Sequence, residues 1–224
     1  MRILVLINHD SGLYNFRKEL VQELVKNHEV YFSLPFGKYM SDLKVIGGTY
    51  IDTRIDRRGI NPLKDIKILY KYKRIVNKYK PDIILSYTIK PNIYGGLIAR
   101  FHNIKFIPNV TGLGSSIQKR SVLRLILLSL YRIAFKNAEK VLFQNEANLD
   151  FFKSNKIVKN NFTLLPGSGV NLESYKVLPY PDNKNIVLLV IGRVMKDKGI
   201  EQVLHISEKF GKKIRIKLIG AMEE

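Results

Sequence analysis

The sequence of 224 residues contains no cysteine, which excludes disulfide bonds and thiolate metal sites. It contains four histidines, at scattered positions that match no metal-ligand spacing: His9, His28, His102 and His205. We therefore expect no structural zinc. Two phosphate-binding fingerprints are also missing, because the sequence has neither Gly-x-x-x-x-Gly-Lys-Ser/Thr nor a Gly-x-Gly-x-x-Gly that follows a strand.

Long hydrophobic runs are missing as well. No uncharged apolar stretch approaches the roughly 20 residues that a membrane-spanning helix needs. The most apolar segment, residues 119–137, is interrupted by Arg124 and Arg132. The apolar run at residues 1–7 has no small-residue cleavage site after it, so we expect no signal peptide. These features predict a cytoplasmic protein that is soluble or lies on the inner face of the cell membrane.

Acidic residues are few compared with basic ones. The 38 Lys and Arg outnumber the 19 Asp and Glu, which gives a net charge of +19. Most of the excess lies in residues 1–178, with 29 cations and 13 anions, against 9 and 6 in residues 179–224. Such a charge implies an anionic partner, which can be a nucleic acid, a membrane surface or a phosphorylated substrate. No RNP, helix-turn-helix or zinc-finger pattern is present, so we expect no nucleic acid partner.

Strand-length apolar runs alternate with helical patterns along the chain, which predicts an α/β fold with a parallel sheet. The predicted strands are residues 3–7, 30–34, 50–55, 83–86, 105–109, 140–143, 162–165, 186–191 and 214–219. The predicted helices are residues 14–27, 62–79, 92–101, 119–137, 146–154 and 200–210. Residues 178–185 look like a linker, so we predict an N-terminal domain, residues 1–178, and the start of a second domain, residues 179–224.

Ligands of parallel α/β sheets bind at the carboxyl ends of the strands. The loops around Gly12, residues 87–92 and residues 110–116 each follow a predicted strand, so we expect them to share one edge of the sheet. Glycines and hydroxyl side chains in these loops suit a polar ligand that approaches the backbone. For His9 and Asp10 we favour ordinary helix capping over catalysis.

The loop at residues 192–199 joins a predicted strand to a predicted helix and is a candidate anion site. Gly192 allows the backbone to approach a ligand closely, and Arg193 and Lys198 supply two cations. The N-terminus of the following helix offers unpaired N–H groups. The alternative is that these cations are ordinary solvated loop charges, and the loop by itself does not decide between the two.

Two predicted helices have unusual faces. Residues 62–79 place five cations within an arc of about 80°, next to an apolar arc, and these cations are Lys64, Lys67, Lys71, Arg74 and Lys78. This face is either solvated or in contact with anionic lipid. Residues 119–137 are apolar nearly all round, which suits either a core helix or an interfacial helix whose arginines meet lipid headgroups.

The strand-end loops together resemble a known family. The segments that carry the resemblance are residues 8–17, 87–95, 109–115 and 166–171, and Gly192-Arg193 with Lys198-Gly199. They are similar to the GT-B glycosyltransferases of the large retaining family 4, which build capsule, lipopolysaccharide O-antigen and N-glycan precursors in bacteria. Thr-x-Lys-Pro and Val-Thr-Gly-Leu-Gly-Ser resemble the branch that acts on undecaprenyl-diphosphate-linked acceptors.

The resemblance implies two Rossmann-like domains, with the acceptor bound mainly to the first and a nucleotide sugar, assumed to be a UDP-sugar, mainly to the second. It implies a retaining transfer to a polyprenyl-diphosphate-linked saccharide at the anionic inner-membrane surface, with no cofactor and no metal. Arg193 and Lys198 match the pair that neutralises the departing diphosphate. The implied donor contacts also include Gly12 and Gly192, and the implied acceptor contacts are Arg17, Lys90, Thr111, Gly112, Gly114 and Ser115.

One part of the family pattern is missing from the sequence. The Glu-x7-Glu region that holds the donor sugar is not found within the 224 residues. Residues 179–224 are also well short of a usual domain of about 100 residues, so we expect a truncated chain. The alternative function is therefore a non-catalytic N-terminal module that binds a lipid-linked acceptor or an anionic membrane without transferring a sugar.

Overall fold

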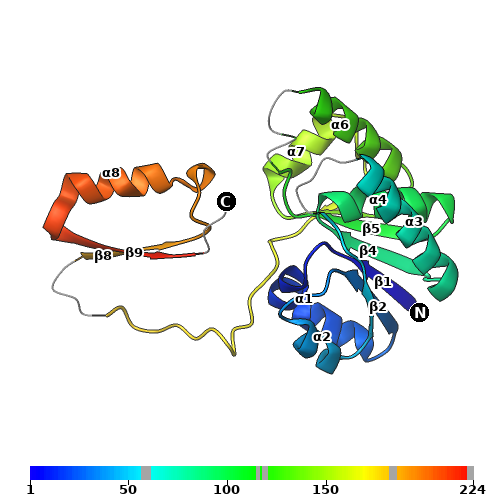
Figure 1. Ribbon diagram of the computed structural model, residues 1–224, viewed down its shortest axis with the longest axis horizontal. Coiled ribbons are helices and arrows are strands. Elements are labelled where there is room, and N and C mark those ends of the chain that lie inside the picture. Colours follow the sequence, from blue (N-terminus) through cyan, green and yellow to red (C-terminus); the bar gives the residue numbers. More distant parts are fainter. Residues whose placement is uncertain (57–61, 115–116, 118–120, 182–185, 221–224) are drawn as a thin grey trace. The chain divides into compact units, whose positions relative to one another are not determined.

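A computed structural model describes the chain except for residues 57–61, 115–116, 118–120, 182–185 and 221–224. The chain divides into two units, Met1–Asn171 and Leu172–Glu224 (Figure 1). Each unit has its own sheet, and they are described separately below.

The first unit is built on a seven-stranded parallel sheet with the order β3-β2-β1-β4-β5-β6-β7. The strands are β1 (Arg2–Leu6), β2 (Glu29–Leu34), β3 (Thr49–Asp52), β4 (Ile83–Tyr87), β5 (Lys105–Val110), β6 (Val141–Phe143) and β7 (Phe162–Leu164). The chain runs outward from β1 to β3 and then returns to the other side of β1 to form β4. The order therefore reverses between β1 and β4, which is where doubly wound sheets bind their ligands.

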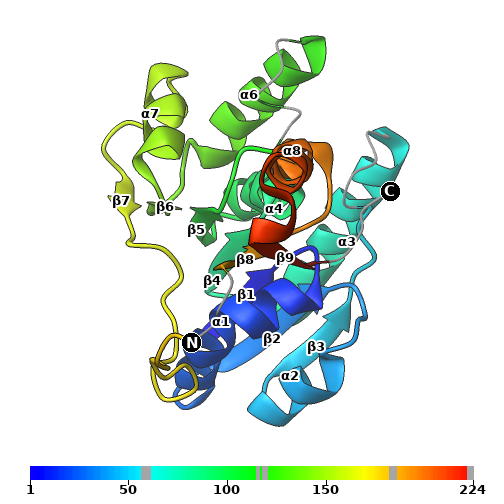
Figure 2. The same cartoon turned by 90° about the vertical axis from the view of Figure 1, so that its left-hand side faces the viewer.

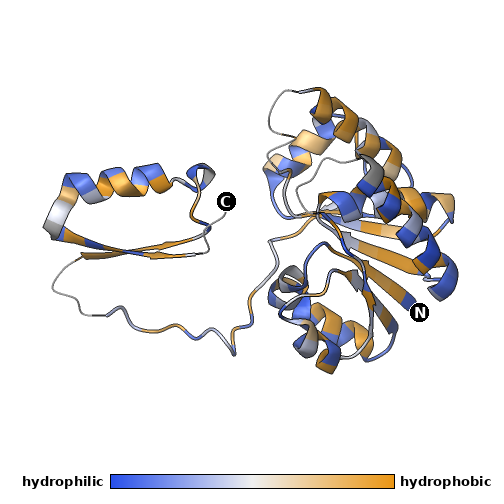
Figure 3. Ribbon diagram, viewed as in Figure 1, coloured by the Kyte–Doolittle hydropathy of each residue, from blue (hydrophilic) through white to orange (hydrophobic). Residues whose placement is uncertain are grey.

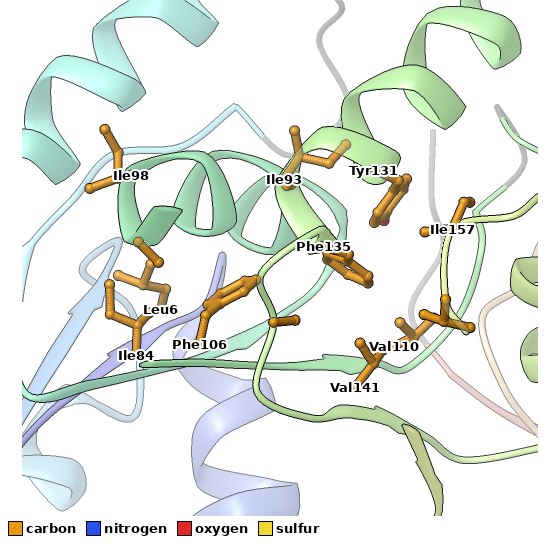
Figure 4. Packing of buried hydrophobic residues seen from close by; sticks show 14 of the residues in the cluster. Leu6, Ile84, Ile93, Ile98, Phe106, Val110, Tyr131, Phe135, Val141 and Ile157 are labelled. Carbon is orange, nitrogen blue, oxygen red and sulfur yellow. The ribbon is translucent and has the colours of Figure 1, made fainter. Parts of the chain in front are cut away.

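Helices cover both faces of this sheet (Figures 1 and 2). One face carries α1 (Asp10–Val25) and α2 (Met40–Ile46), and the other carries α3 (Pro62–Tyr79), α4 (Ile89–Phe101), α6 (Val122–Phe135) and α7 (Glu146–Ser154). Two apolar cores result. In the larger one Phe135 of α6 packs edge to face against Phe106 of β5 and Tyr131 of its own helix, with ring centroids 6.1 and 5.2 Å apart (Figure 4).

Two adjacent glycines allow α4 to lie close to its neighbours. A Cβ on Gly95 would lie 2.6 Å from the Leu6 side chain, and one on Gly96 would lie 2.7 Å from the Phe106 ring. These distances are too short for ordinary van der Waals contact. The Gly-Gly pair, which disfavours a helix by propensity, is therefore required by packing against β1 and β5.

The structure corrects several predicted boundaries. The first helix begins at Asp10 rather than residue 14, and α4 begins at Ile89 rather than residue 92. Gly12 and Lys90 consequently lie in the first turns of helices and not in loops. The sequence analysis also missed α2, whose Met40 and Leu43 are buried at helical spacing.

Each of the two unusual helices has a buried and an exposed face. Figure 3 shows the hydropathy of the residues along the chain. The apolar arc of α3 enters the core at Ile68, Tyr72, Ile75 and Val76, whereas Lys64, Lys67, Arg74 and Lys78 are exposed. The most apolar helix, α6, buries Leu128, Tyr131, Ala134 and Phe135. Its opposite face leaves Val122, Leu125 and Ile126 exposed at 74%, 64% and 52%. The core-helix prediction is therefore right for one face of α6 only.

The second unit contains a single β-α-β arrangement. Strands β8 (Ile186–Ile191) and β9 (Ile214–Ile219) pair in parallel and are joined by α8 (Ile200–Phe210). Two short 3₁₀ turns, η1 (Lys196–Lys198) and η2 (Gly211–Lys213), flank α8. Among the residues that the structure describes in this unit, none is buried, because one helix cannot cover both faces of a sheet.

Candidate functional site

Most of the site residues predicted in the first unit, the donor contact Gly12 among them, lie at one edge of the first sheet. The paired ends of β1, β4 and β5 are aligned, with Leu6 opposite Ser86 and Tyr87 opposite Asn109. The segments that carry Gly12, Lys90, Thr111, Gly112 and Gly114 leave this edge directly after the three strands. The parallel topology therefore places them together, as expected, at the point where the strand order reverses.

Two side chains fix the segment after β1 by accepting hydrogen bonds from backbone N–H groups. Imidazole Nδ1 of His9 accepts a hydrogen bond from the Gly12 N–H at 2.7 Å and caps α1. A Cβ on Gly12 would overlap the His9 ring, so glycine is needed here. The buried Asp10 carboxylate accepts from the N–H groups of Ser11 and Tyr39, at 2.7 and 2.6 Å. His9 and Asp10 thus have the capping roles that the sequence favoured.

Arg17 of α1 is buried although it carries a charge. Its guanidinium lies 4.9 Å from the centroid of the Tyr87 ring, and Nη1 donates to the Phe16 carbonyl at 2.6 Å. Within the part of the chain that the structure describes, no carboxylate forms an ion pair with Arg17. Burial raises the pKa of the Tyr87 hydroxyl, and the nearby guanidinium partly opposes this rise. A buried cation without a carboxylate partner suits an anionic ligand.

Lys90 has a different environment. Its ammonium lies 2.7 Å from the Asp65 carboxylate of α3, and the two side chains are only 14% and 17% exposed. Burial and a hydrogen bond to Asp65 raise the pKa of the Tyr94 hydroxyl. The Asp65 carboxylate therefore interacts with both Lys90 and Tyr94. The charge of Lys90 is therefore opposed by the Asp65 carboxylate.

The segment after β5 is open to solvent. Thr111, Gly112 and Gly114 are exposed, and a Cβ on Gly112 would meet no atom within 4 Å. Gly114 has a φ of 68° and lies against the side chain of Ile89, at the start of α4. Backbone groups of this segment are accessible to a ligand, as predicted. Ser115 lies outside the described residues.

Beneath this edge a short polar network joins β4, α4 and β5. The Ser86 hydroxyl donates to Oδ1 of Asn92 at 2.7 Å, and Nδ2 of Asn92 donates to the Asn109 carbonyl at 3.0 Å. Three polar atoms close to it have no hydrogen-bond partner among the described residues, namely Asn8 Oδ1, Thr88 Oγ1 and Asn109 Oδ1. Sequence reasoning did not select these three residues, although each is a polar residue at or just past the end of a buried strand.

The candidate anion loop of the second unit has the predicted strand, loop and helix. The Gly192 N–H donates to the Ile219 carbonyl at 3.0 Å, and the chain then turns through η1. Gly199 has a φ of 78° and precedes α8 without any side-chain cap. Arg193 and Lys198 are exposed at the surface of this loop. The loop therefore has the strand, turn and helix order that the sequence predicted, and an anion site here remains a prediction.

Two further observations bear on where ligands bind. A hollow lined by Met1, His28, Tyr79 and Asp82 lies at the amino edge of the first sheet, opposite the predicted site residues. Within the described ranges, no group of three or more His, Asp or Glu side chains is placed to hold a metal ion. In the same residues, no helix is both long and apolar enough to cross a membrane.

Residues 2–145, which span β1 to β6, match the family described as glycosyl transferase 4-like. The chain belongs to this family. The match includes every strand end and loop of the first unit discussed above except the loop after β7. The family resemblance stated from the sequence is thereby confirmed, and so is the α/β fold.

Among named relatives, the chain is 27% identical over 242 residues to N,N'-diacetylbacillosaminyl-diphospho-undecaprenol alpha-1,3-N-acetylgalactosaminyltransferase of Campylobacter jejuni. The alignment covers all of this chain and 64% of that protein, so the chain spans less than two thirds of the relative's length.

Two solved structures have the same fold. One is Anabaena HepE in complex with UDP and glucose, with a TM-score of 0.76, 14% identity, and coverage of 100% of this chain and 62% of that chain. The other is a glycosyltransferase from Rickettsia africae, with a TM-score of 0.66, 17% identity, and coverage of 97% and 68%. At these identities the likeness shows the fold alone, which is that of GT-B glycosyltransferases.

Proposed function

We propose that this protein acts as a retaining glycosyltransferase that moves a sugar from a nucleotide sugar, a UDP-sugar, to a polyprenyl-diphosphate-linked saccharide. The observation that carries the proposal is the family match, together with a relative whose name specifies a diphospho-undecaprenol acceptor. The product would enter bacterial surface polysaccharide, such as capsule or lipopolysaccharide, or a lipid-linked glycan.

On the donor side, the loop between β8 and α8 supplies positive charge and N–H donors for the departing nucleotide. Arg193 and Lys198 are two exposed cations on a loop that leads into an uncapped helix N-terminus. Fixed cations and N–H groups stabilise the negative charge that develops on a leaving diphosphate. In this proposal the protein's own cations neutralise that charge, so the reaction uses no cofactor. Gly192 allows the diphosphate to approach the backbone.

On the acceptor side, the edge formed by β1, β4 and β5 offers groups for a diphosphate. Arg17 is a buried cation with no carboxylate partner among the described residues, and the exposed backbone at Thr111, Gly112 and Gly114 adds N–H donors. Gly12, an implied donor contact, lies in the first turn of α1 at the same edge, and its N–H already donates to Nδ1 of His9. The ion pair of Lys90 with Asp65 must loosen before Lys90 can contact a phosphate.

The experiment for the donor side is a calorimetric titration of UDP and a UDP-sugar into the 224-residue chain, beside the double variant Arg193→Ala and Lys198→Ala. We expect micromolar binding that the double substitution abolishes. Replacing Lys196, which pairs with Glu201 at 3.1 Å, gives a control that removes a cation of the same loop. If wild type binds neither compound, donor recognition by this chain is refuted.

A specific observation supports the alternative function. The first unit has a complete seven-stranded sheet and two buried cores, whereas no described residue of the second unit is buried. A chain of this kind can bind a lipid-linked acceptor through its first unit without transferring a sugar. Acceptor binding in the absence of UDP binding is the outcome that selects this alternative.

For the membrane, the exposed apolar face of α6 is the proposed contact. Val122, Leu125 and Ile126 lie on one side of the helix, and the exposed cations Arg132 and Lys136 border it. Apolar side chains enter the interface while each nearby cation contributes about 1 kcal/mol with anionic lipid. We propose that this face rests on the anionic inner surface of the cell membrane.

Sedimentation with vesicles tests the membrane contact. Wild type should bind vesicles of phosphatidylglycerol more strongly than vesicles of phosphatidylcholine, and the variant Leu125→Asp with Ile126→Asp should lose most of this binding. Val45→Asp is the control, because Val45 is 88% exposed on α2, across the sheet from α6. Equal loss of binding in the control and the α6 variant would show that α6 is not the contact.

A further inference from the structure

Three hydrogen-bonding atoms at the ends of neighbouring strands are buried and have no partner among the described residues. They are Asn8 Oδ1 after β1, Thr88 Oγ1 after β4 and Asn109 Oδ1 in β5. Continuing the β1–β4 register by two residues places Asn8 level with Thr88, and Asn109 pairs with Tyr87. Adjacent strands are about 4.8 Å apart, so the three residues occupy one short stretch of the carboxyl edge.

Asn109 gives the strongest signal of the three. This residue is only 4% exposed, and its backbone carbonyl is already engaged by Asn92, while its side-chain oxygen is not. Buried polar atoms are almost always hydrogen-bonded, because leaving one unpaired forfeits the hydrogen bonds that it makes with water. A buried polar atom with no partner among the described residues therefore points to a ligand that supplies the missing hydrogen bond.

The backbone of Thr88 adds a second, independent sign. Thr88 has a φ of 72° and a ψ of 162°, a conformation that a β-branched residue rarely adopts. Thr88 precedes α4 at the N-cap position, yet its side chain makes no capping hydrogen bond. No side-chain cap accompanies this strained conformation between β4 and α4, and such strain is concentrated at ligand sites.

The chemistry of these atoms limits the ligand. The carbonyl oxygens of Asn8 and Asn109 only accept hydrogen bonds, whereas the Thr88 hydroxyl can accept or donate. The ligand must therefore present donors to the two asparagines, which phosphate oxygens cannot do. Sugar hydroxyls and acetamido N–H groups are such donors. Arg17 stacks on Tyr87, the strand neighbour of Asn109, and supplies a cation beside the same edge. A saccharide joined to a phosphate has both kinds of group.

We propose that Asn8, Thr88 and Asn109 form a subsite that accepts hydrogen bonds from the sugar hydroxyl or acetamido groups of the acceptor, while Arg17 binds its phosphate. This inference rests on the proposed function and assigns to it the residues that recognise the saccharide. The subsite discriminates a saccharide diphosphate from a bare diphosphate. The unpaired atoms and the strained Thr88 lower the stability of the free chain, and a bound saccharide satisfies the unpaired atoms.

The test combines stability and binding in variants of the 224-residue chain. Asn109→Leu replaces an unpaired amide with an apolar side chain of similar size, and Thr88→Gly removes the hydroxyl and relieves the positive φ. Both variants should unfold at the same temperature as wild type or at a higher one. Their affinity for N-acetylglucosamine 1-phosphate should fall about tenfold, and their affinity for inorganic pyrophosphate should stay within about twofold.

Tyr72→Phe is the matched control. The Tyr72 hydroxyl is also buried with no hydrogen-bond partner among the residues that the structure describes, but it lies in the core on α3 and not among the strand ends. This variant should keep both the wild-type stability and the wild-type affinity for N-acetylglucosamine 1-phosphate.

The outcomes separate this inference from the proposed function. If wild type binds neither N-acetylglucosamine 1-phosphate nor pyrophosphate, the proposed acceptor site itself is wrong. If wild type binds the sugar phosphate and both variants bind it equally well, only the saccharide subsite is refuted. A loss of stability in both variants would show that Thr88 and Asn109 have structural roles, which also overturns the subsite.

Discussion

Replacing Lys90 by methionine removes one partner of the ion pair between α3 and α4. The two charged groups lie 2.7 Å apart and their side chains are 14% and 17% exposed, so water screens them only in part. Breaking a fully buried pair costs 3–5 kcal/mol, and an exposed pair contributes about 1 kcal/mol or less. For this half-buried pair we expect Lys90→Met to lower the free energy of unfolding of the first unit by about 2 kcal/mol. At this chain length the melting temperature should fall by about 4–8 °C.

A double-mutant cycle with Asp65→Asn isolates the ion pair. Asparagine keeps an oxygen that can accept the hydrogen bond from Tyr94, so the substitution removes mainly the charge. We expect the double variant to be less destabilised than the two single changes predict together, by about 1 kcal/mol or more. The assay is thermal and urea unfolding followed by circular dichroism. Strictly additive losses would refute the view that Lys90 and Asp65 stabilise the fold as a pair.

The same variants decide whether Lys90 contacts the acceptor. If it does, Asp65→Asn should strengthen the binding of pyrophosphate, because Lys90 is no longer opposed by a carboxylate, and Lys90→Met should weaken it. Unchanged binding in both variants would mean that Lys90 has a structural role only. The sequence alone suggested an acceptor contact, and the tertiary structure supplies the competing ion pair.

Two further predictions concern packing and pH. Gly96→Ala should destabilise the first unit by about 2 kcal/mol, because its Cβ would lie 2.7 Å from the Phe106 ring, even though alanine favours helices. Urea unfolding measures the effect. Gly112→Ala is the control, because no atom lies within 4 Å of a Cβ at that position. Burial raises the pKa of the Tyr72 and Tyr131 hydroxyls above the ordinary value of about 10. Above pH 10 the unfolded chain loses these protons first, so the free energy of unfolding should fall by about 1.4 kcal/mol per pH unit for each tyrosine. The tyrosinate absorbance that disappears in the variants Tyr72→Phe and Tyr131→Phe should therefore accompany the loss of circular dichroism in wild type. If that part of the absorbance develops near pH 10 while the chain is still folded, the reasoning is wrong.

The sequence predicted elements well wherever local signals were strong. Helix α3 has the predicted bounds because Pro62 opens it and a proline after Tyr79 stops it. Strand β8 has the predicted bounds because six β-branched or leucine residues form an unbroken run. The start of α1 was placed four residues too late because its first residues, Asp10, Ser11 and Gly12, are of types that favour loops and turns. Short helices such as α2 carry too few turns for a reliable periodic signal.

By itself, then, the sequence determined the alternation of strands and helices, the cation excess and the loops that follow the strands. All of these depend on the order and spacing of residues along the chain. Only the tertiary structure decided which cations have partners. Lys90 forms an ion pair with Asp65, which is 25 residues away in the sequence, whereas Arg17 of α1 stacks on the ring of Tyr87 in β4. The burial of the Asn109 side-chain oxygen, which has no partner among the described residues, is likewise a property of the assembled sheet. Whether water reaches a polar atom depends on how the neighbouring elements pack around it, and the residue type alone does not determine this.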